Sequence, residues 1–159
     1  MDALSRLLDG SVDLHVHSSP SLSPRRVDHV EAARVADGFR MRAIVVKSHH
    51  HTTAPEVALM RKHLLCHLGV QVFGAVALNS YTGGLNPYIV DMTIRLGGRV
   101  VWFPTISASR HIQHHEAHTH VKFPTQAGRE LPETPIRLID ERGELVPQAR
   151  EILRLVADA

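Results

Sequence analysis

His15 and His17 lie at the end of a short apolar run, in the stretch VDLHVHSSPS that covers residues 12–21. Side chains alternate across a β-strand, so residues separated by one position point to the same side. Two imidazoles side by side can bind one divalent ion, and histidine is the commonest metal ligand in proteins. The spacing predicts a metal site, with Asp13 placed to orient a ring. Two ordinary polar residues where a strand meets a loop would give the same pattern.

A second chemical candidate is Lys47, in the stretch RAIVVKSHHH that covers residues 42–51. Strand alternation places Lys47 and His49 on one face and Ile44 and Val46 on the other. A lysine at the end of a buried strand must be paired, shifted toward its neutral form or chemically modified. A carbamylated Lys47 would be an anionic metal ligand, and an unmodified one would polarise a substrate or bind an anion. An ion pair with Asp13 is the structural alternative.

A third group of histidines lies in SRHIQHHEAHTH, residues 109–120, within a long segment without regular periodicity that covers residues 108–135. Loops of this length are usually functional or disordered, so we predict a lid over the site. Histidines one helical turn apart could also chelate a transition metal. The candidates for the general base are His111, His114 and His115. An exposed polar loop is the alternative, and the zinc-protease motif HExxH is absent.

Short apolar, β-branched runs recur at residues 11–17, 42–49, 70–79 and 99–105, and their starts are about 30 residues apart. Helical patterns fill the gaps, with Pro55 and Pro87 in expected first turns and Asn86 as an expected N-cap. Residues 136–147 are expected to form a small hairpin, and residues 147–159 a last helix. Alternating strands and helices predict an α/β fold with parallel strands and crossover helices.

In a (β/α) barrel the active site lies at the carboxyl ends of the strands, where His15, Lys47, Asn79 and Thr105 would meet. A complete barrel has about 250 residues, and this chain of 159 residues offers about four of the eight units. We therefore predict a single domain over residues 1–159 that forms a half or truncated TIM-like barrel. Such a half leaves a strand edge open, which predicts a homo-oligomer.

The composition narrows the classes of partner. The formal net charge is only +2, so we expect neither nucleic acid nor an anionic membrane as partner. No apolar run reaches the roughly 18 residues that span a bilayer, and the first ten residues do not resemble a signal peptide. A single cysteine allows no intrachain disulfide, which suits the cytoplasm. A small-molecule substrate is the expected partner.

The stretches DLHVHSSPS, AIVVKSHH, GAVALN, GGLNP and VVWFPT, in this order, resemble the N-terminal half of the barrel in a bacterial branch of amidohydrolase-like metal-dependent hydrolases. The resemblance implies one or two divalent ions, zinc foremost, with His15 and His17 as ligands. Lys47 and His49 would complete or flank that site. It also implies that a metal-activated water attacks an ester, amide or related bond of a small molecule.

Two other functions remain open at this point. Phosphoesterases of the polymerase-and-histidinol-phosphatase type also begin with a histidine pair of this spacing, so the motif does not separate the two enzyme classes. A non-catalytic metal-binding or assembly module could keep the same fold without the full set of ligands. Metal content and activity on a panel of substrates would distinguish the three.

Overall fold

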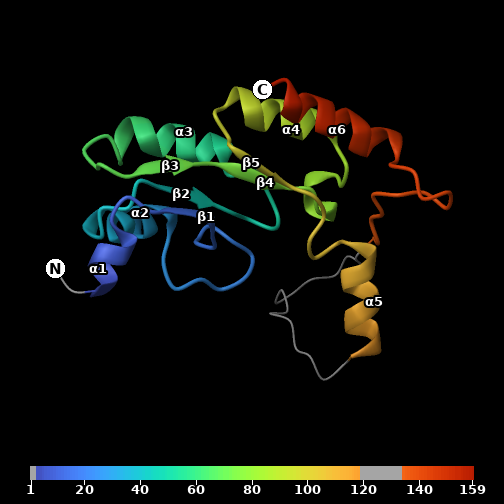
Figure 1. The fold of residues 1–159 in the computed structure, drawn as a ribbon, viewed down its shortest axis with the longest axis horizontal. Helices are drawn as coiled ribbons and strands as arrows, with labels where there is room; N and C mark the ends of the chain where they lie inside the picture. Colours follow the sequence, from blue (N-terminus) through green and yellow to red (C-terminus); the bar gives the residue numbers. More distant parts are fainter. Residues whose placement is uncertain (1–2, 119–133) are drawn as a thin grey trace.

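A computed structural model describes residues 3–118 and 134–159 of the chain (Figure 1). Strands and helices alternate along it, as the sequence predicted. The elements are α1 (Ala3–Leu8), β1 (Val12–Val16), α2 (His29–Gly38), β2 (Ala43–Val46), α3 (Ala54–His63), β3 (Gln71–Phe73), β4 (Ala75–Ala77), the 3-10 turn η1 (Ser80–Thr82), α4 (Pro87–Arg95), β5 (Val100–Trp102), α5 (Ser109–Ala117) and α6 (Pro147–Ala157). None of these helices is long and apolar enough to cross a membrane.

The strands form two parallel sheets, and within the described residues they do not close into a barrel. One sheet has the order β1-β2-β3, and the other pairs β4 with β5. The single strand predicted over residues 70–79 is therefore wrong, because it breaks at Gly74. A Cβ on Gly74 would lie 2.4 Å from the Cα of Ala54. The first turn of α3 packs so closely there that only glycine fits.

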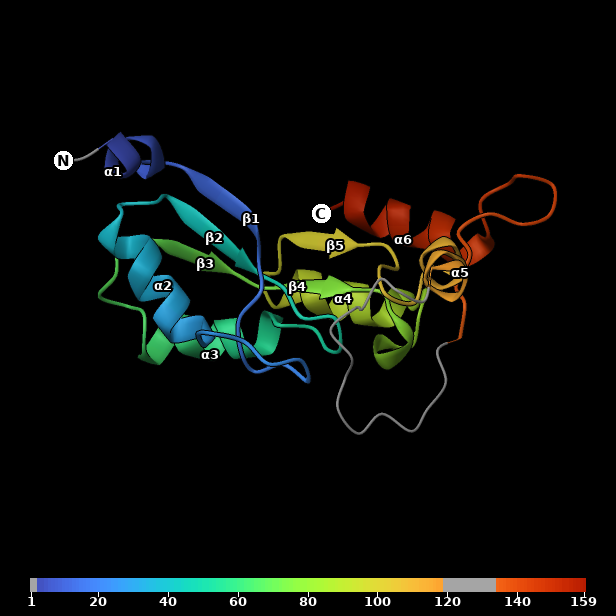
Figure 2. The same ribbon diagram turned by 90° about the horizontal axis from the view of Figure 1, so that it is seen from below.

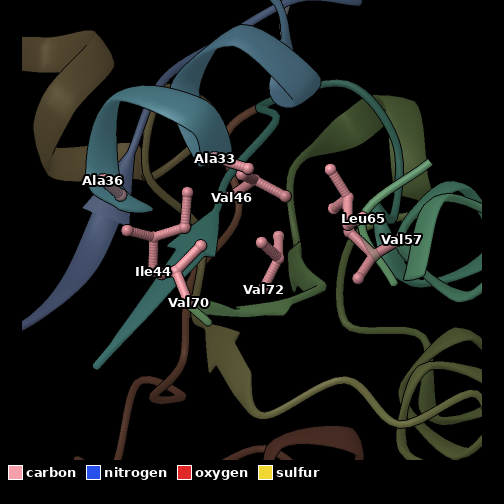
Figure 3. Close-up of a cluster of buried hydrophobic side chains, with 8 residues drawn as sticks. All are labelled: Ala33, Ala36, Ile44, Val46, Val57, Leu65, Val70 and Val72. Carbon is pink, nitrogen blue, oxygen red and sulfur yellow. The ribbon is translucent and has the colours of Figure 1, made fainter. Parts of the chain in front are cut away.

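Helices cover one face of the sheets and form two clusters of buried side chains. Helices α2 and α3 pack on β2 and β3 through the cluster in Figure 3: Ala33, Ala36, Ile44, Val46, Val57, Leu65, Val70 and Val72. Helices α4 and α6 pack on β4 through Val76, Leu78, Val90 and Ile152. The alternation predicted for β2 is confirmed, since Ile44 and Val46 face the helices. Lys47 follows on the opposite face.

Local signals explain where the helices begin. Asp28 and Glu31 form a capping box at the start of α2. Asn86 caps α4 by accepting a hydrogen bond from the Tyr88 amide, and Pro87 follows at the first position, as predicted. Helix α3 ends at His63. His63 and His67 therefore do not share one helix face.

Strand β1 lies at an edge, because β2 is its only strand partner among the described residues. Val12 and Leu14, which share a strand face with Val16, are exposed there. Only Val16 of this strand packs against the buried cluster. The predicted self-association would cover these side chains, and it stays a prediction.

The predicted loop over residues 108–135 is wrong in its first part, where α5 forms a helix. The reason is tertiary: the amide of Ser109 donates to the carbonyl of Ile136 at 2.9 Å, and the amide of Ile136 donates to Ser107 at 2.8 Å. These bonds anchor the first turn against a segment that follows later in the chain. Residues 119–133, including His120, lie outside the described residues. The predicted hairpin is present as an antiparallel bridge between Ile139 and Leu145.

The sheets curl so strongly that side chains of non-adjacent strands meet on the face opposite the helices. The ring centroids of His15 on β1 and Trp102 on β5 are 5.5 Å apart, although these strands belong to different sheets. Figure 2 shows β1 and β5 approaching each other in this way. The curvature creates a concave face at the carboxyl ends of the strands.

Candidate functional site

The histidine pair lies on this concave face. The Nε2 atoms of His15 and His17 are 3.1 Å apart. Two imidazole ligands of one tetrahedral zinc ion, each about 2.0 Å from the metal, lie about 3.3 Å apart. The pairing of β1 with β2 is irregular between Asp13 and Val16. Within that irregularity Asp13 accepts a hydrogen bond from the backbone amide of His15 at 2.9 Å. Asp13 therefore orients the main chain, and not a ring as predicted.

Lys47 extends toward the same pair from β2. Its Nζ lies 3.1 Å from Nε2 of His15 and 4.7 Å from the centroid of the Trp102 ring. The side chain is buried, with 3% of its surface exposed. No carboxylate among the described residues forms an ion pair with it, so the alternative of a bond to Asp13 is not seen. The aromatic ring partly replaces the water that the ammonium group loses on burial.

His49 completes the cluster from the end of β2. Its ring stacks on that of His17 with centroids 4.8 Å apart, and its Nδ1 lies 3.1 Å from Oγ1 of Thr105. Asn79, fully buried at the end of β4, donates from Nδ2 to the carbonyl of His49 and to Thr105, both at 3.0 Å. Its Oδ1 accepts from the amides of Thr105 at 2.8 Å and Ser107 at 3.2 Å. Asn79 thus joins the ends of β2, β4 and β5.

Burial and positive neighbours keep the imidazoles neutral. Burial, and then the charges of Arg25, Lys47 and His15, lower the pKa of His17 to about 4. Burial, followed by the charge of Lys47, lowers the pKa of His49 to about 3 and also lowers that of His15. Burial alone lowers the pKa of Lys47 to about 8. The three rings are therefore neutral at pH 7, which is the form in which imidazole binds metal ions.

Behind the cluster, two serine–histidine pairs share the carboxylate of Glu56. Oγ of Ser18 lies 2.5 Å from Nδ1 of His29, whose Nε2 is 3.6 Å from Glu56. Oγ of Ser48 lies 2.9 Å from Nδ1 of His51, whose Nε2 is 3.2 Å from Glu56. Both serines are buried and follow His17 and Lys47 directly in the chain. Through His29 and His51 these pairs tie the chain after His17 and after Lys47 to Glu56 on α3.

Glu56 should make the stability of the protein depend on pH. Burial raises its pKa, but the adjacent rings and charges of His29 and His51 outweigh burial and lower it from 4.5 to about 2. A carboxyl whose pKa falls on folding stabilises the fold above its unfolded pKa, and this stabilisation is lost as the pH drops through the folded one. We expect Glu56→Gln to lower the free energy of unfolding by about 2 kcal/mol at pH 7, allowing for solvent screening, with the loss vanishing between pH 4.5 and 2.

Urea denaturation of the wild type and Glu56→Gln across that pH range measures this dependence. The control is Glu151→Gln on the exposed side of α6, which should follow the wild type. Parallel stability curves for the wild type and Glu56→Gln would contradict the role of Glu56.

The histidines of α5 and its C-cap residue His118 contact one another in pairs. The rings of His111 and His115 have centroids 4.4 Å apart, and those of His114 and His118 are 4.3 Å apart. Figures 1 and 2 place α5 beyond the carboxyl ends of β4 and β5 and away from β1. The assignment of His111, His114 and His115 as general base stays a prediction.

Comparison with known proteins assigns the chain to a family. The model of DUF6282, a family of unknown function, matches residues 10–159. The chain belongs to this family. The match spans every strand and the whole histidine cluster, so the site lies within the region that defines DUF6282. No curated protein and no solved structure matches the chain.

The described residues of this DUF6282 chain do not by themselves complete a set of metal ligands around the histidine pair. Within residues 3–118 and 134–159, no group of three histidine, cysteine, aspartate or glutamate side chains converges to hold a metal ion. Two pockets in this part of the chain lie elsewhere. The larger, of about 600 Å³, lies between α5 and residues 136–140. Among the described residues, Lys47 and His49 are the side chains that lie against the pair and could add a third ligand.

Sequence reasoning missed three residues that act on the site of this DUF6282 chain. Trp102 had a usable signal, since it lies near the carboxyl end of a predicted strand of the curved sheet. Arg25 had none, because its position depends on how the loop after β1 folds back. Glu56 also had none, because its two histidine partners come from the start of α2 and the loop after β2. Only packing brings these segments together.

Proposed function

We propose that this chain is a metal-dependent hydrolase of the amidohydrolase-like type, in which His15 and His17 bind a divalent ion. Zinc is the first candidate. The observation that carries the proposal is the 3.1 Å separation of the two Nε2 atoms at the carboxyl end of a parallel strand. This is the end of a strand at which α/β proteins bind ligands.

The chemistry of the donors fits such an ion. Both rings are held on the concave face, and Nδ1 of His17 is buried without a hydrogen-bond partner in the described part of the chain. His49 stacks on His17 and would be the nearest further imidazole, while a carbamylated Lys47 would supply an anionic ligand. A divalent ion held there supplies Lewis-acid activation of water and of the bond that the water attacks.

The residues around the pair have roles of their own in this proposal. An unmodified Lys47 would stabilise negative charge on a substrate oxygen, because it carries its charge in a dry setting. His49 would hydrogen-bond the attacking water or the substrate through Nε2, since Thr105 orients its ring through Nδ1. Trp102 would form one wall of the site and exclude water from it.

A phosphoesterase of the polymerase-and-histidinol-phosphatase type is a second candidate. The charges of Arg25 and Lys47 both act on His17, and cations of this kind suit a phosphate group. Hydrolysis of phosphoesters without hydrolysis of esters or amides would favour this alternative.

A non-catalytic metal-binding module is the third candidate. The absence of a converging group of three ligands among the described residues favours it. Metal binding without activity on any class of substrate would be its signature.

Metal analysis tests the proposal most directly. The protein is purified without added metal, and its metal content is measured for the wild type and for His15→Ala/His17→Ala. We expect about one ion per chain in the wild type and less than about a tenth of that in the variant, because the variant removes both proposed ligands. His63→Ala/His67→Ala, which removes two exposed histidines, is the matched control and should retain the metal.

Activity is then compared on esters, lactones, amides and phosphoesters for the same three proteins. The proposal predicts hydrolysis of a non-phosphate bond by the wild type and the control, and none by the variant that lacks His15 and His17. Equal metal content in all three proteins would refute the assignment of the ligands.

A further inference from the structure

The amino group of Lys47 lacks a negative partner. Its nearest polar neighbour is the neutral ring of His15, and its other close contact is the face of Trp102. It is almost fully buried, and no carboxylate in the described residues forms an ion pair with it. A buried charge is costly unless it is paired or neutralised. The fold therefore keeps a cation in a place where a bound anion would stabilise it.

The other charged groups around the histidine cluster are also mostly positive, so Lys47 is not balanced by nearby negative charge. For His17 and His49, every charged neighbour that shifts the ring is a cation or another histidine, with Arg25 and Lys47 acting on both. The acid closest to the pair is Asp13, which binds the amide of His15 through Oδ1. No carboxylate among the described residues is thus placed to neutralise Arg25 and Lys47 together.

Arg25 lies in the loop after β1, near enough to His17 and His49 for its charge to lower the pKa of both rings. This loop folds back on itself, because the amide of Ser19 donates to the carbonyl of Val27 at 2.9 Å and the amide of His29 donates to Ser19 at 3.0 Å. Nε of Arg25 lies 3.4 Å from Oγ of Ser21, and no carboxylate of the described residues pairs with the guanidinium. Its terminal nitrogens remain available for a ligand.

We infer that the ligand of this site carries an oxyanion, either a carboxylate or a phosphate group, which binds to Nζ of Lys47 with Arg25 as the second cation. The histidine pair lies next to this anchor, so the anion would orient the rest of the molecule toward His15 and His17. Calling this ligand the substrate rests on the proposed function. The binding of the anion is independent of the proposed function, because Lys47 and Arg25 carry their charges whether or not a metal is bound.

Anion binding is tested on the metal-free protein, with the chelator removed by dialysis so that it does not compete. Inorganic phosphate and acetate are titrated by calorimetry into the wild type, Lys47→Met, Arg25→Gln and Arg26→Gln. Methionine keeps the apolar stem of the lysine and removes its charge. Arg26 is the exposed neighbour of Arg25 and serves as the matched control.

We expect Lys47→Met to weaken binding of the preferred anion at least about tenfold, because a charge-assisted hydrogen bond is lost from a buried place. Arg25→Gln should weaken it about threefold to tenfold, and Arg26→Gln less than about twofold. The anion with the higher affinity identifies the class of ligand. Tighter binding of phosphate indicates a phosphorylated ligand, and tighter binding of acetate indicates a carboxylate.

Arg25→Gln keeps the test decisive if Lys47→Met fails to fold, since Arg25 lies in a surface loop. Equal affinities in the wild type, Arg25→Gln and Arg26→Gln, or no binding of either anion, would overturn the inference. A chain that binds phosphate or acetate through Arg25 and Lys47 but holds no metal would support the inference and refute the proposed function. A chain that binds metal but neither phosphate nor acetate would support the proposed function and refute the inference.

Discussion

Replacing Asn79 by alanine is expected to lower the free energy of unfolding by about 4 kcal/mol. The amide side chain is fully buried and satisfies the carbonyl of His49 and the amides of Thr105 and Ser107. Alanine would leave these three backbone groups without their partner, and each buried polar group left unsatisfied costs about 1–3 kcal/mol. The change also releases the end of β2, so the ring of His49 should lose its fixed position.

Urea denaturation measures the loss of stability, and the imidazole NMR signals of His49 report the loss of order. The matched control is Asn86→Ala, which removes a single hydrogen bond to the amide of Tyr88 at the start of α4. This cap should be worth about 1 kcal/mol. If Asn79→Ala cost no more than Asn86→Ala, Asn79 would not join the strand ends as described.

Replacing Gly74 by alanine is expected to lower the free energy of unfolding by about 3 kcal/mol or more. The added Cβ would lie 2.4 Å from the Cα and 2.7 Å from the nitrogen of Ala54, and both are backbone atoms that cannot rotate away. Helix α3 would have to move. That movement would strain the hydrogen bonds of Thr53, which donates from Oγ1 to Val46 at 2.8 Å and accepts from the amide of Ala75 at 2.9 Å.

Thermal unfolding measures this effect, and a loss of about 3 kcal/mol corresponds to a fall in Tm of about 6 °C or more in a domain of this size. Gly38→Ala is the matched control. Gly38 lies in the last turn of α2, and a Cβ there would meet no atom within 4 Å. Alanine should be neutral or slightly stabilising at this position. Similar Tm values for the two variants would show that the start of α3 can move away from residue 74 at little cost in stability.

Local patterns in the sequence were enough for the order of the elements and for the direction of the key side chains. The apolar runs predicted the strands β1, β2 and β5, and Asn86 with Pro87 predicted the start of α4. Strand alternation placed Lys47 on the face opposite the helices. These features depend on residues close together in the chain, whose geometry the backbone repeats.

The tertiary structure decided the rest. The break at Gly74 depends on how closely the start of α3 approaches the sheet, and the contact between His15 and Trp102 depends on the curl of the strands. Helix α5 depends on its anchor at Ile136. Such contacts join segments far apart in the chain, and no local period encodes which of them meet. The sequence by itself determined that two histidines and a lysine share one face. Only packing decided that the lysine is buried there beside an aromatic ring, with no carboxylate of the described residues to pair with it.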